Sequence, residues 1–191
     1  MIFRFQLKKL EFIEILLKQM RSIILTFLII VLILPSRSFA ALDYGKQSLV
    51  GADFSGSDLK GATFYLTDLQ DANLSDCELQ NATLYGAKLK DTNLSNSNLR
   101  EVTLDSAILD GTDLSNTNLE DSFAYSTQFE NVKIQGADFT NVFLPKDIVR
   151  KFCDSASGTN PITNRDTRET LECDYIWIYA HTSSFLIFLC L

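Results

Sequence analysis

A large apolar side chain stands at every fifth position from residue 49 to residue 144, and Ala124 is the one exception among 20 positions. The side chain two residues earlier is small in every unit after the first. Two inward positions separated by one residue suit an extended segment, because alternate side chains of a strand share a face. A helix would need a period near 3.6 and a flat strand a period of 2. The pattern therefore predicts a coil of short extended sides.

The position two residues after each large side chain predicts the corners of this coil. It is Gly, Asn or Asp in 15 of the 20 units, and six of the eight glycines of the chain stand there. These residue types tolerate the backbone angles of tight turns. Large and small inward residues would then alternate with outward polar residues around a continuous core.

The repeat resembles the pentapeptide repeat family, whose motif A-(D/N)-L-x-x stands here as Ala52-Asp53-Phe54, Ala72-Asn73-Leu74 and Ala137-Asp138-Phe139. The resemblance implies an all-β solenoid, a right-handed quadrilateral β-helix of about five coils with four pentapeptides per coil. Residues 20 apart should then stack in columns. We expect the β-helix to occupy residues 41–145.

Residues 1–40 form the predicted N-terminal extension and signal peptide. An apolar run from Ile23 to Leu34 follows Arg21 and precedes Ser38-Phe39-Ala40, which predicts export and cleavage between Ala40 and Ala41. The run is short for a membrane span of about 20 residues, although an uncleaved anchor is the alternative. Translation could start at Met1 or Met20.

The segment after the repeat, residues 146–173, predicts a helical cap over the last coil. Lys146 to Cys153 has a short helical pattern, and Asp166 with Glu169 has the spacing of a helix N-cap. The segment resembles the end of pentapeptide repeat proteins exported to the thylakoid lumen or periplasm of oxygenic phototrophs. That resemblance implies two helices bracketed by a disulfide between Cys153 and Cys173, with a zinc site as the rival use of these cysteines.

Residues 174–191 form an apolar tail of uncertain status that departs from the family pattern. It could associate with a membrane, cover a face of the repeat, or result from a change of reading frame. Beyond this tail and the signal segment we expect no membrane contact.

Two outward columns of the predicted coil carry aromatic residues. One column holds Thr63, Thr83, Thr103, Phe123 and Phe143, and the neighbouring column holds Tyr65, Tyr85, Asp105 and Tyr125. Aromatic residues and threonine also suit any β surface. The sharper interpretation is a partner-binding face made of five side chains: Tyr65, Tyr85, Phe123, Tyr125 and Phe143. Because Ala124 would leave a void in the core, we also expect Phe123 or Tyr125 to turn inward.

Charge restricts the possible functions. Residues 49–144 carry 5 basic and 15 acidic side chains, which argues against binding nucleic acid through its phosphates. The chain has one histidine and no catalytic motif, so we expect no enzyme activity, no metal and no cofactor. The expected function is an exported protein-protein interaction or scaffold module with an unknown protein partner. The alternative is a DNA mimic that inhibits or protects a DNA-binding enzyme such as gyrase, as some family members do.

Overall fold

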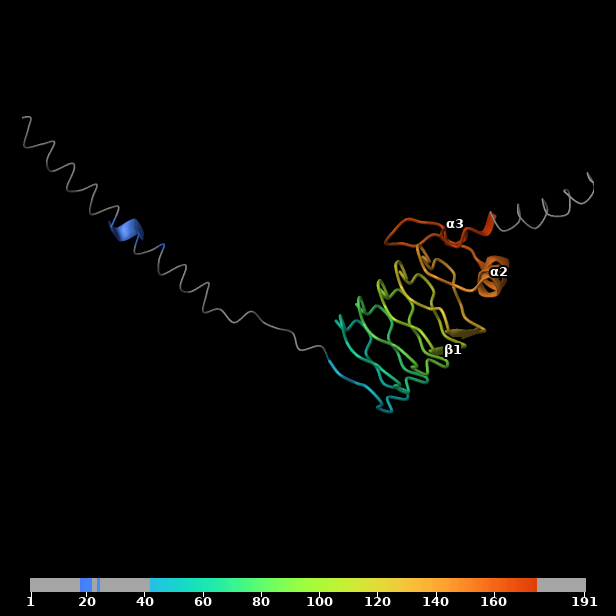
Figure 1. Cartoon of the computed structure of the whole chain (residues 1–191), viewed down its shortest axis with the longest axis horizontal. Helices are drawn as coiled ribbons and strands as arrows, with labels where there is room; N and C mark the ends of the chain where they lie inside the picture. Colours follow the sequence, from blue (N-terminus) through green and yellow to red (C-terminus); the bar gives the residue numbers. More distant parts are fainter. Residues whose placement is uncertain (1–17, 22–23, 25–41, 175–191) are drawn as a thin grey trace, which may run out of the picture. The chain divides into compact units, whose positions relative to one another are not determined.

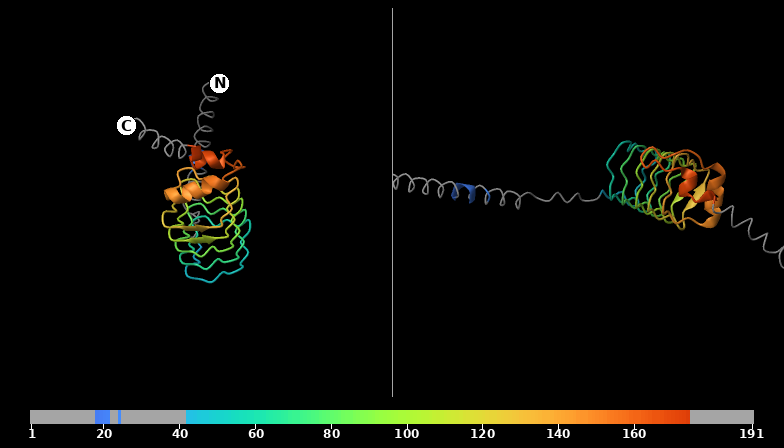
Figure 2. Two further views of the ribbon diagram at one scale, coloured as in Figure 1. Left: turned by 90° about the vertical axis from the view of Figure 1, so that its right-hand side faces the viewer. Right: turned by 90° about the horizontal axis from the view of Figure 1, so that it is seen from above.

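The computed structural model describes residues 18–21, 24 and 42–174, and the chain divides into two units, Met1–Ala40 and Ala41–Leu191. The second unit contains strands β1 (Ile108–Asp110) and β2 (Gln128–Glu130) and helices α2 (Lys146–Ser155) and α3 (Thr167–Thr170). The remainder of its repeat region consists of short extended sides joined by turns. Figures 1 and 2 show these sides stacked coil on coil.

Each side pairs in parallel with the side 20 residues further along the chain. Strands β1 and β2 pair with Leu109 opposite Phe129, and single bridges repeat the same offset from Asp43↔Thr63 to Phe123↔Phe143. The backbone N–H of Phe64 donates to Thr83 O at 2.7 Å, and Thr83 N–H donates to Ala62 O at 2.9 Å. One coil is therefore 20 residues long, which is four pentapeptides, as the resemblance implies.

The corners adopt the left-handed conformation that the turn residues predict. Between positions 46 and 141, every described fifth residue except Ser126 has a positive φ, whether it is Gly, Asn, Asp or another residue. This conformation costs an ordinary L-residue about 1–2 kcal/mol, and the cost is lowest for Gly, Asn and Asp. The residue preference at this position is thus a consequence of the corner geometry.

The core consists of the large residue and the small residue from each side. In the middle coils the large residue is leucine, and these leucine side chains are completely buried from Leu69 to Leu114. Several small inward hydroxyl residues donate to the preceding coil: Thr92 Oγ1 donates to Leu69 O at 2.7 Å and Thr112 Oγ1 to Leu89 O at 2.6 Å. At these positions a hydroxyl enters the core with a hydrogen-bond partner, whereas the buried Oγ of Ser122 has none among the described residues.

Cys77 occupies the same small inward position as these hydroxyl residues. Its Sγ lies 3.0 Å from Phe54 O, and the side chain is buried. Burial raises the pKa of the thiol, and no shift in the opposite direction overcomes it. Cys77 is thus a core thiol, as its position in the repeat predicts.

The expectation that Phe123 or Tyr125 turns inward is wrong. Ala124 points inward and is buried, whereas Phe123 and Tyr125 are 58% and 63% exposed. The same coil carries Phe129 and Phe139 where the coil before it carries leucine, so larger side chains offset the missing volume. The backbone adapts as well, because Ser126 lacks the positive φ and Tyr125 N–H donates to Asp105 Oδ1 at 2.8 Å.

Helices α2 and α3 follow the last repeat and lie beyond its final coil (Figure 1). Phe152 of α2 packs against Phe129 and Phe139, with ring centroids 5.2 and 5.5 Å away. Asp166 is the N-cap of α3, and its Oδ1 accepts from Arg168 N at 2.8 Å. The Sγ atoms of Cys153 and Cys173 are bonded at 2.04 Å, which joins α2 to the segment after α3.

The predicted signal segment, its cleavage position at Ala40 and Ala41, and the tail beyond residue 174 lie outside the described residues. Within the described parts of the chain, no helix is long and apolar enough to cross a bilayer.

Candidate partner-binding face

The parallel bridges place the predicted aromatic residues on one side of the coil. Thr63, Thr83, Thr103, Phe123 and Phe143 pair in succession, so they form one column. The column of Tyr65, Tyr85, Asp105 and Tyr125 stands two residues further along each side. We call these two columns, together with the corner residue that follows each side, the aromatic face.

This face gathers most of the exposed apolar side chains of the second unit. Ten large hydrophobic residues between 42 and 174 are exposed, and three of them, Leu42, Val50 and Ile162, lie elsewhere. The other seven lie on the aromatic face or directly across its corner: Tyr65, Leu66, Tyr85, Ile108, Phe123, Tyr125 and Phe143. Random scatter of single apolar residues is ordinary on a protein surface, whereas such a concentration is typical of an interaction site.

The aromatic rings form two separate groups. Tyr65 and Tyr85 stack with their centroids 5.6 Å apart and their planes 15° from parallel. Tyr125 and Phe143 pack at 5.5 Å with planes 31° apart. Both tyrosines of the first group are 39% exposed, and the rings of the second group are more exposed. Stacking holds each group in place before any partner arrives, which lowers the entropy lost on binding.

Asp105 separates the two aromatic groups. It stands in the tyrosine column where a third ring would complete the stack, and its Oδ1 accepts the backbone N–H of Tyr125 at 2.8 Å. No ion pair involving Asp105 is present among residues 42–174. The face therefore carries aromatic rings toward both ends and a negative charge between them.

Leu66 is a member of this face that the sequence analysis missed. It occupies a corner with φ 54°, where every other non-glycine residue of the described repeat is polar or charged, and it is 47% exposed. A Cβ on Gly86 would lie 2.5 Å from Leu66 Cδ2, so the glycine leaves room for the leucine side chain. A large exposed apolar side chain at a corner that elsewhere carries glycine or a polar residue enlarges the apolar surface of the aromatic face. The sequence does indicate this residue, because Leu66 is the one apolar side chain at a corner position that otherwise holds glycine or polar residues.

The opposite side of the coil is polar and is paired within itself. Asn73 Nδ2 donates to Asp53 Oδ1 at 3.2 Å, and Lys133 Nζ lies 3.0 Å from Asp113 Oδ2. The pKa of Asp113 is affected most by burial, which raises it, but hydrogen bonds from Ser115 and the charge of Lys133 lower it below its usual value. Carboxylates on this side therefore have their partners already.

The acidic columns do not converge on a metal site. Lys60 Nζ stands 3.8 Å from Asp58 Oδ1 and 3.7 Å from Glu78 Oε2, which places an ammonium group between these carboxylates. In the part of the chain that the structure describes, no three His, Cys, Asp or Glu side chains gather closely enough to hold a metal ion.

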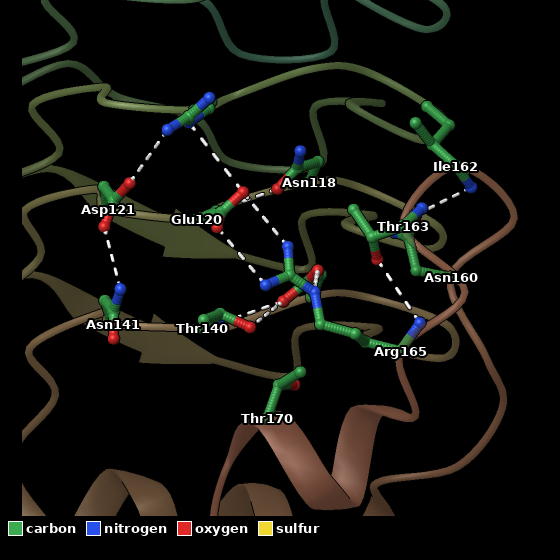
Figure 3. A network of polar contacts seen from close by, with 12 residues as sticks. Asn118, Glu120, Asp121, Thr140, Asn141, Asn160, Ile162, Thr163, Arg165 and Thr170 are labelled. Carbon is green, nitrogen blue, oxygen red and sulfur yellow. Dashed lines mark hydrogen bonds and ion pairs between the residues drawn. The ribbon is translucent and has the colours of Figure 1, made fainter.

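A second cluster fixes the loop between α2 and α3 to the wall of the coil (Figure 3). Arg165 reaches Glu120 Oε2 at 3.0 Å and Asp138 Oδ2 at 2.8 Å. Burial of Asp138 opposes its ionisation, but hydrogen bonds from Thr140 and Thr163 and the charge of Arg165 keep the pKa of this carboxyl below its usual value. Asp138 is fully buried, so the pair ties the loop to the last coil.

Asn160 is the other anchor of this loop. Its side chain is fully buried, and Nδ2 lies within hydrogen-bonding distance of the carbonyl oxygens of Thr117, Gly136 and Asn116, at 2.9, 2.9 and 3.2 Å. Oδ1 accepts the backbone N–H groups of Ile162 and Thr163, 3.0 and 3.1 Å away. One amide thus joins two successive coils to the loop, and the cluster is structural rather than a ligand site.

A parallel solenoid of 20-residue coils with left-handed corners defines a repeat protein of the β-helical class. The profile described as "Pentapeptide repeats (8 copies)" matches residues 48–84, 77–116 and 107–144. The chain belongs to the pentapeptide repeat family, and its β-helix is right-handed and quadrilateral like those of the family.

Solved structures of this family resemble the chain to different degrees. A pentapeptide repeat protein from the thylakoid lumen of Arabidopsis thaliana shares 36% identity over 68% of this chain and 90% of its own, with a TM-score of 0.66. Rfr23 from the cyanobacterium Cyanothece 51142 shares 28% identity over 54% of this chain and 64% of its own, with a TM-score of 0.31.

A more distant structure is QnrB1, a plasmid-mediated fluoroquinolone resistance protein. It shares 16% identity over 59% of this chain and 62% of its own, with a TM-score of 0.48. No curated protein matches the sequence.

Proposed function

We propose that this protein is an exported, non-enzymatic interaction module that binds another protein through its aromatic face. Its body is a rigid β-helix of about five coils, and α2, α3 and the disulfide close the C-terminal end as a cap. The observation that carries the proposal is the gathering of six exposed apolar side chains on one side of the coil and its corner, with Ile108 directly across that corner. Burying such side chains against a partner would contribute favourable free energy without any movement of the backbone.

The cap has a physical role in this proposal. The open end of a solenoid exposes core side chains and unpaired strand edges, which invite association with other chains. Phe152 covers the rings of Phe129 and Phe139, and Lys151 Nζ lies 3.1 Å from Glu130 Oε2 on the last coil. Because the cap closes the C-terminal end of the β-helix, a partner protein would bind at the aromatic face on its side instead.

Export to the thylakoid lumen or a periplasm is part of the proposal. The apolar run before Ala41, the disulfide and the lumenal protein of Arabidopsis thaliana at 36% identity all support it. Disulfides persist in oxidising compartments and are rare in the cytosol.

The DNA-mimic alternative is not favoured. It relies on net negative charge alone, and the likeness to QnrB1 is too distant to carry a role across. Several acidic side chains are also neutralised by lysine or arginine of the same chain, as in the Asp68–Lys88 and Asp113–Lys133 pairs.

Affinity capture after cross-linking in the native compartment tests the proposal. The test variant replaces Tyr65, Tyr85 and Tyr125 with serine, which removes three exposed rings. The control variant replaces Ser75, Ser95 and Ser115 with alanine, because these residues occupy the same position of the repeat on another side of the coil. Circular dichroism of both variants checks that the fold is intact.

The proposal predicts that the serine variant loses a partner that the control variant keeps. The lost tyrosine stack should lower stability by only about 1 kcal/mol, so unfolding would not explain the loss. Recovery of the same partners by all three proteins would overturn the aromatic face as the binding surface.

A further inference from the structure

The gap in the tyrosine column at Asp105 indicates what the aromatic face recognises. We infer that it binds a basic segment of a partner protein, with one lysine or arginine side chain seated over Asp105 between Tyr85 and Tyr125. This inference rests on the proposed function and specifies the chemistry of the partner.

The spacing of the coil sets the width of this gap. Tyr85 and Tyr125 stand two coils apart, and two strand spacings amount to about 10 Å. A cation is attracted to an aromatic ring when it lies within about 6 Å of the ring centroid. A single ammonium or guanidinium group over Asp105 would therefore stand about one strand spacing from the side that carries each tyrosine, so that small movements of the exposed rings would bring it into range of both.

The charge of the gap favours a cation over a neutral group. Asp105 Oδ1 accepts the N–H of Tyr125 at 2.8 Å, which holds the carboxylate in the gap, against the backbone of the next coil. Among the described residues, Oδ2 accepts no hydrogen bond and Asp105 has no ion-pair partner, so the counter-charge is absent from the chain's own surface. Elsewhere on the coil Asp68 and Asp113 each have a lysine within 3.5 Å.

The chain itself provides an example of the same contact. Lys46 Nζ lies 5.9 Å from the centroid of the Tyr65 ring, at the N-terminal end of the same aromatic column. The aromatic face thus already carries one ammonium group over one tyrosine. The position over Asp105 differs in having a ring on each side and a carboxylate below.

Apolar residues around the gap would receive the remainder of the segment. Phe123 stands on the coil after Asp105 and is 58% exposed, and Ile108 stands across the corner on the same coil as Asp105 and is 38% exposed. Lysine and arginine bring an aliphatic stem that packs well on such a surface while the charged head reaches the carboxylate. A partner of purely acidic or purely apolar sequence would leave Asp105 buried and unpaired, which is costly.

Nuclear magnetic resonance titration of the full ¹⁵N-labelled chain tests this inference without knowledge of the partner. The probe is a short peptide of alternating glycine and lysine, and the matched probe carries acetylated lysines of the same length. Asp105→Asn removes the charge but keeps an oxygen for the N–H of Tyr125. The control is Asp110→Asn, which stands at the same repeat position on the next side of the same coil, between Lys90 and Glu130.

We expect the lysine peptide to shift amide signals of residues 103–106 and 123–126, and Asp105→Asn to weaken this binding about fivefold. Asp110→Asn should bind like the wild type, and the acetylated peptide should not bind. Equal binding of both peptides, or shifts spread over all acidic columns and unaffected by Asp105→Asn, would overturn the inference.

Two variants distinguish a failure of this inference from a failure of the proposed function. If the tyrosine-to-serine variant loses its partner while Asp105→Asn retains it at full strength, the face is a binding surface but does not recognise a cation. If the tyrosine variant loses nothing, the proposed function itself is wrong.

Discussion

Replacing Asn160 with alanine removes the anchor of the loop between α2 and α3. The wild-type side chain is fully buried and contacts three carbonyl oxygens of the coil and two N–H groups of its own loop. Each net hydrogen bond contributes about 1 kcal/mol, and a buried group left without a partner costs about 1–3 kcal/mol. Detachment and hydration of the loop limit the loss, so we expect Asn160→Ala to lower the free energy of unfolding by about 3 kcal/mol.

Asn160→Asp separates this explanation from a simple effect of size. Aspartate has the same shape and keeps the oxygen that accepts from Ile162 and Thr163. It places a second oxygen where Nδ2 lies 2.9 Å from Thr117 O and Gly136 O, so oxygen faces oxygen. We therefore expect Asn160→Asp to be at least as destabilising as Asn160→Ala, although it is the smaller change in shape.

Equilibrium unfolding in urea with the disulfide intact measures these effects. Asn98→Ala is the control, because the Asn98 side chain is only partly buried and accepts one weak bond, from Arg100 N at 3.3 Å. It should cost less than about 0.5 kcal/mol. A loss below 1 kcal/mol for Asn160→Ala, similar to that of the control, would refute the role of Asn160 as an anchor.

Two further predictions concern a strained corner and a buried carboxylate. Leu66→Asn should raise the free energy of unfolding, measured in thermal melts, by about 1 kcal/mol because asparagine tolerates φ 54° better than leucine does. The same variant should weaken partner capture. A destabilised variant would show instead that the leucine supports the fold. The folded-state pKa of Asp138 lies below its ordinary value of 3.8, so its stabilising effect is present above about pH 4 and is lost as the pH falls through the folded pKa. Asp138→Asn should therefore be less stable than the wild type at pH 7, and the difference should shrink toward pH 2; a constant difference measured by urea unfolding at each pH would contradict this.

The fold follows from the sequence because each pentapeptide repeats the same local requirement. A large residue and a small residue each recur in 19 of 20 units and a Gly, Asn or Asp corner in 15, and the register of the columns follows from four units per coil. The positions of Thr63, Tyr65 and Asp105 on one side could therefore be predicted without coordinates. The pairing of Asn73 with Asp53 follows from the same register.

Departures from the repeat were harder to predict. At Ala124 the sequence indicates missing volume, but it does not reveal that Phe129, Phe139 and the corner at Ser126 accommodate it. The anchors Asn160 and Arg165 lie in a non-repeating loop, where no periodicity relates them to Glu120 and Asp138. Their contacts join residues 24 to 45 positions apart and depend on the path of a single irregular segment.

Site-specific photo-cross-linking tests the binding role of the aromatic face most directly. A photoreactive phenylalanine analogue replaces Tyr125 in one protein and Ser115, at the same repeat position on another side, in a second. Both proteins are irradiated in the native compartment and their adducts are separated by mass. We predict an adduct of defined mass from position 125 that is absent from position 115. Equal adducts from both positions, or none from position 125, would contradict the assignment of this face to a partner.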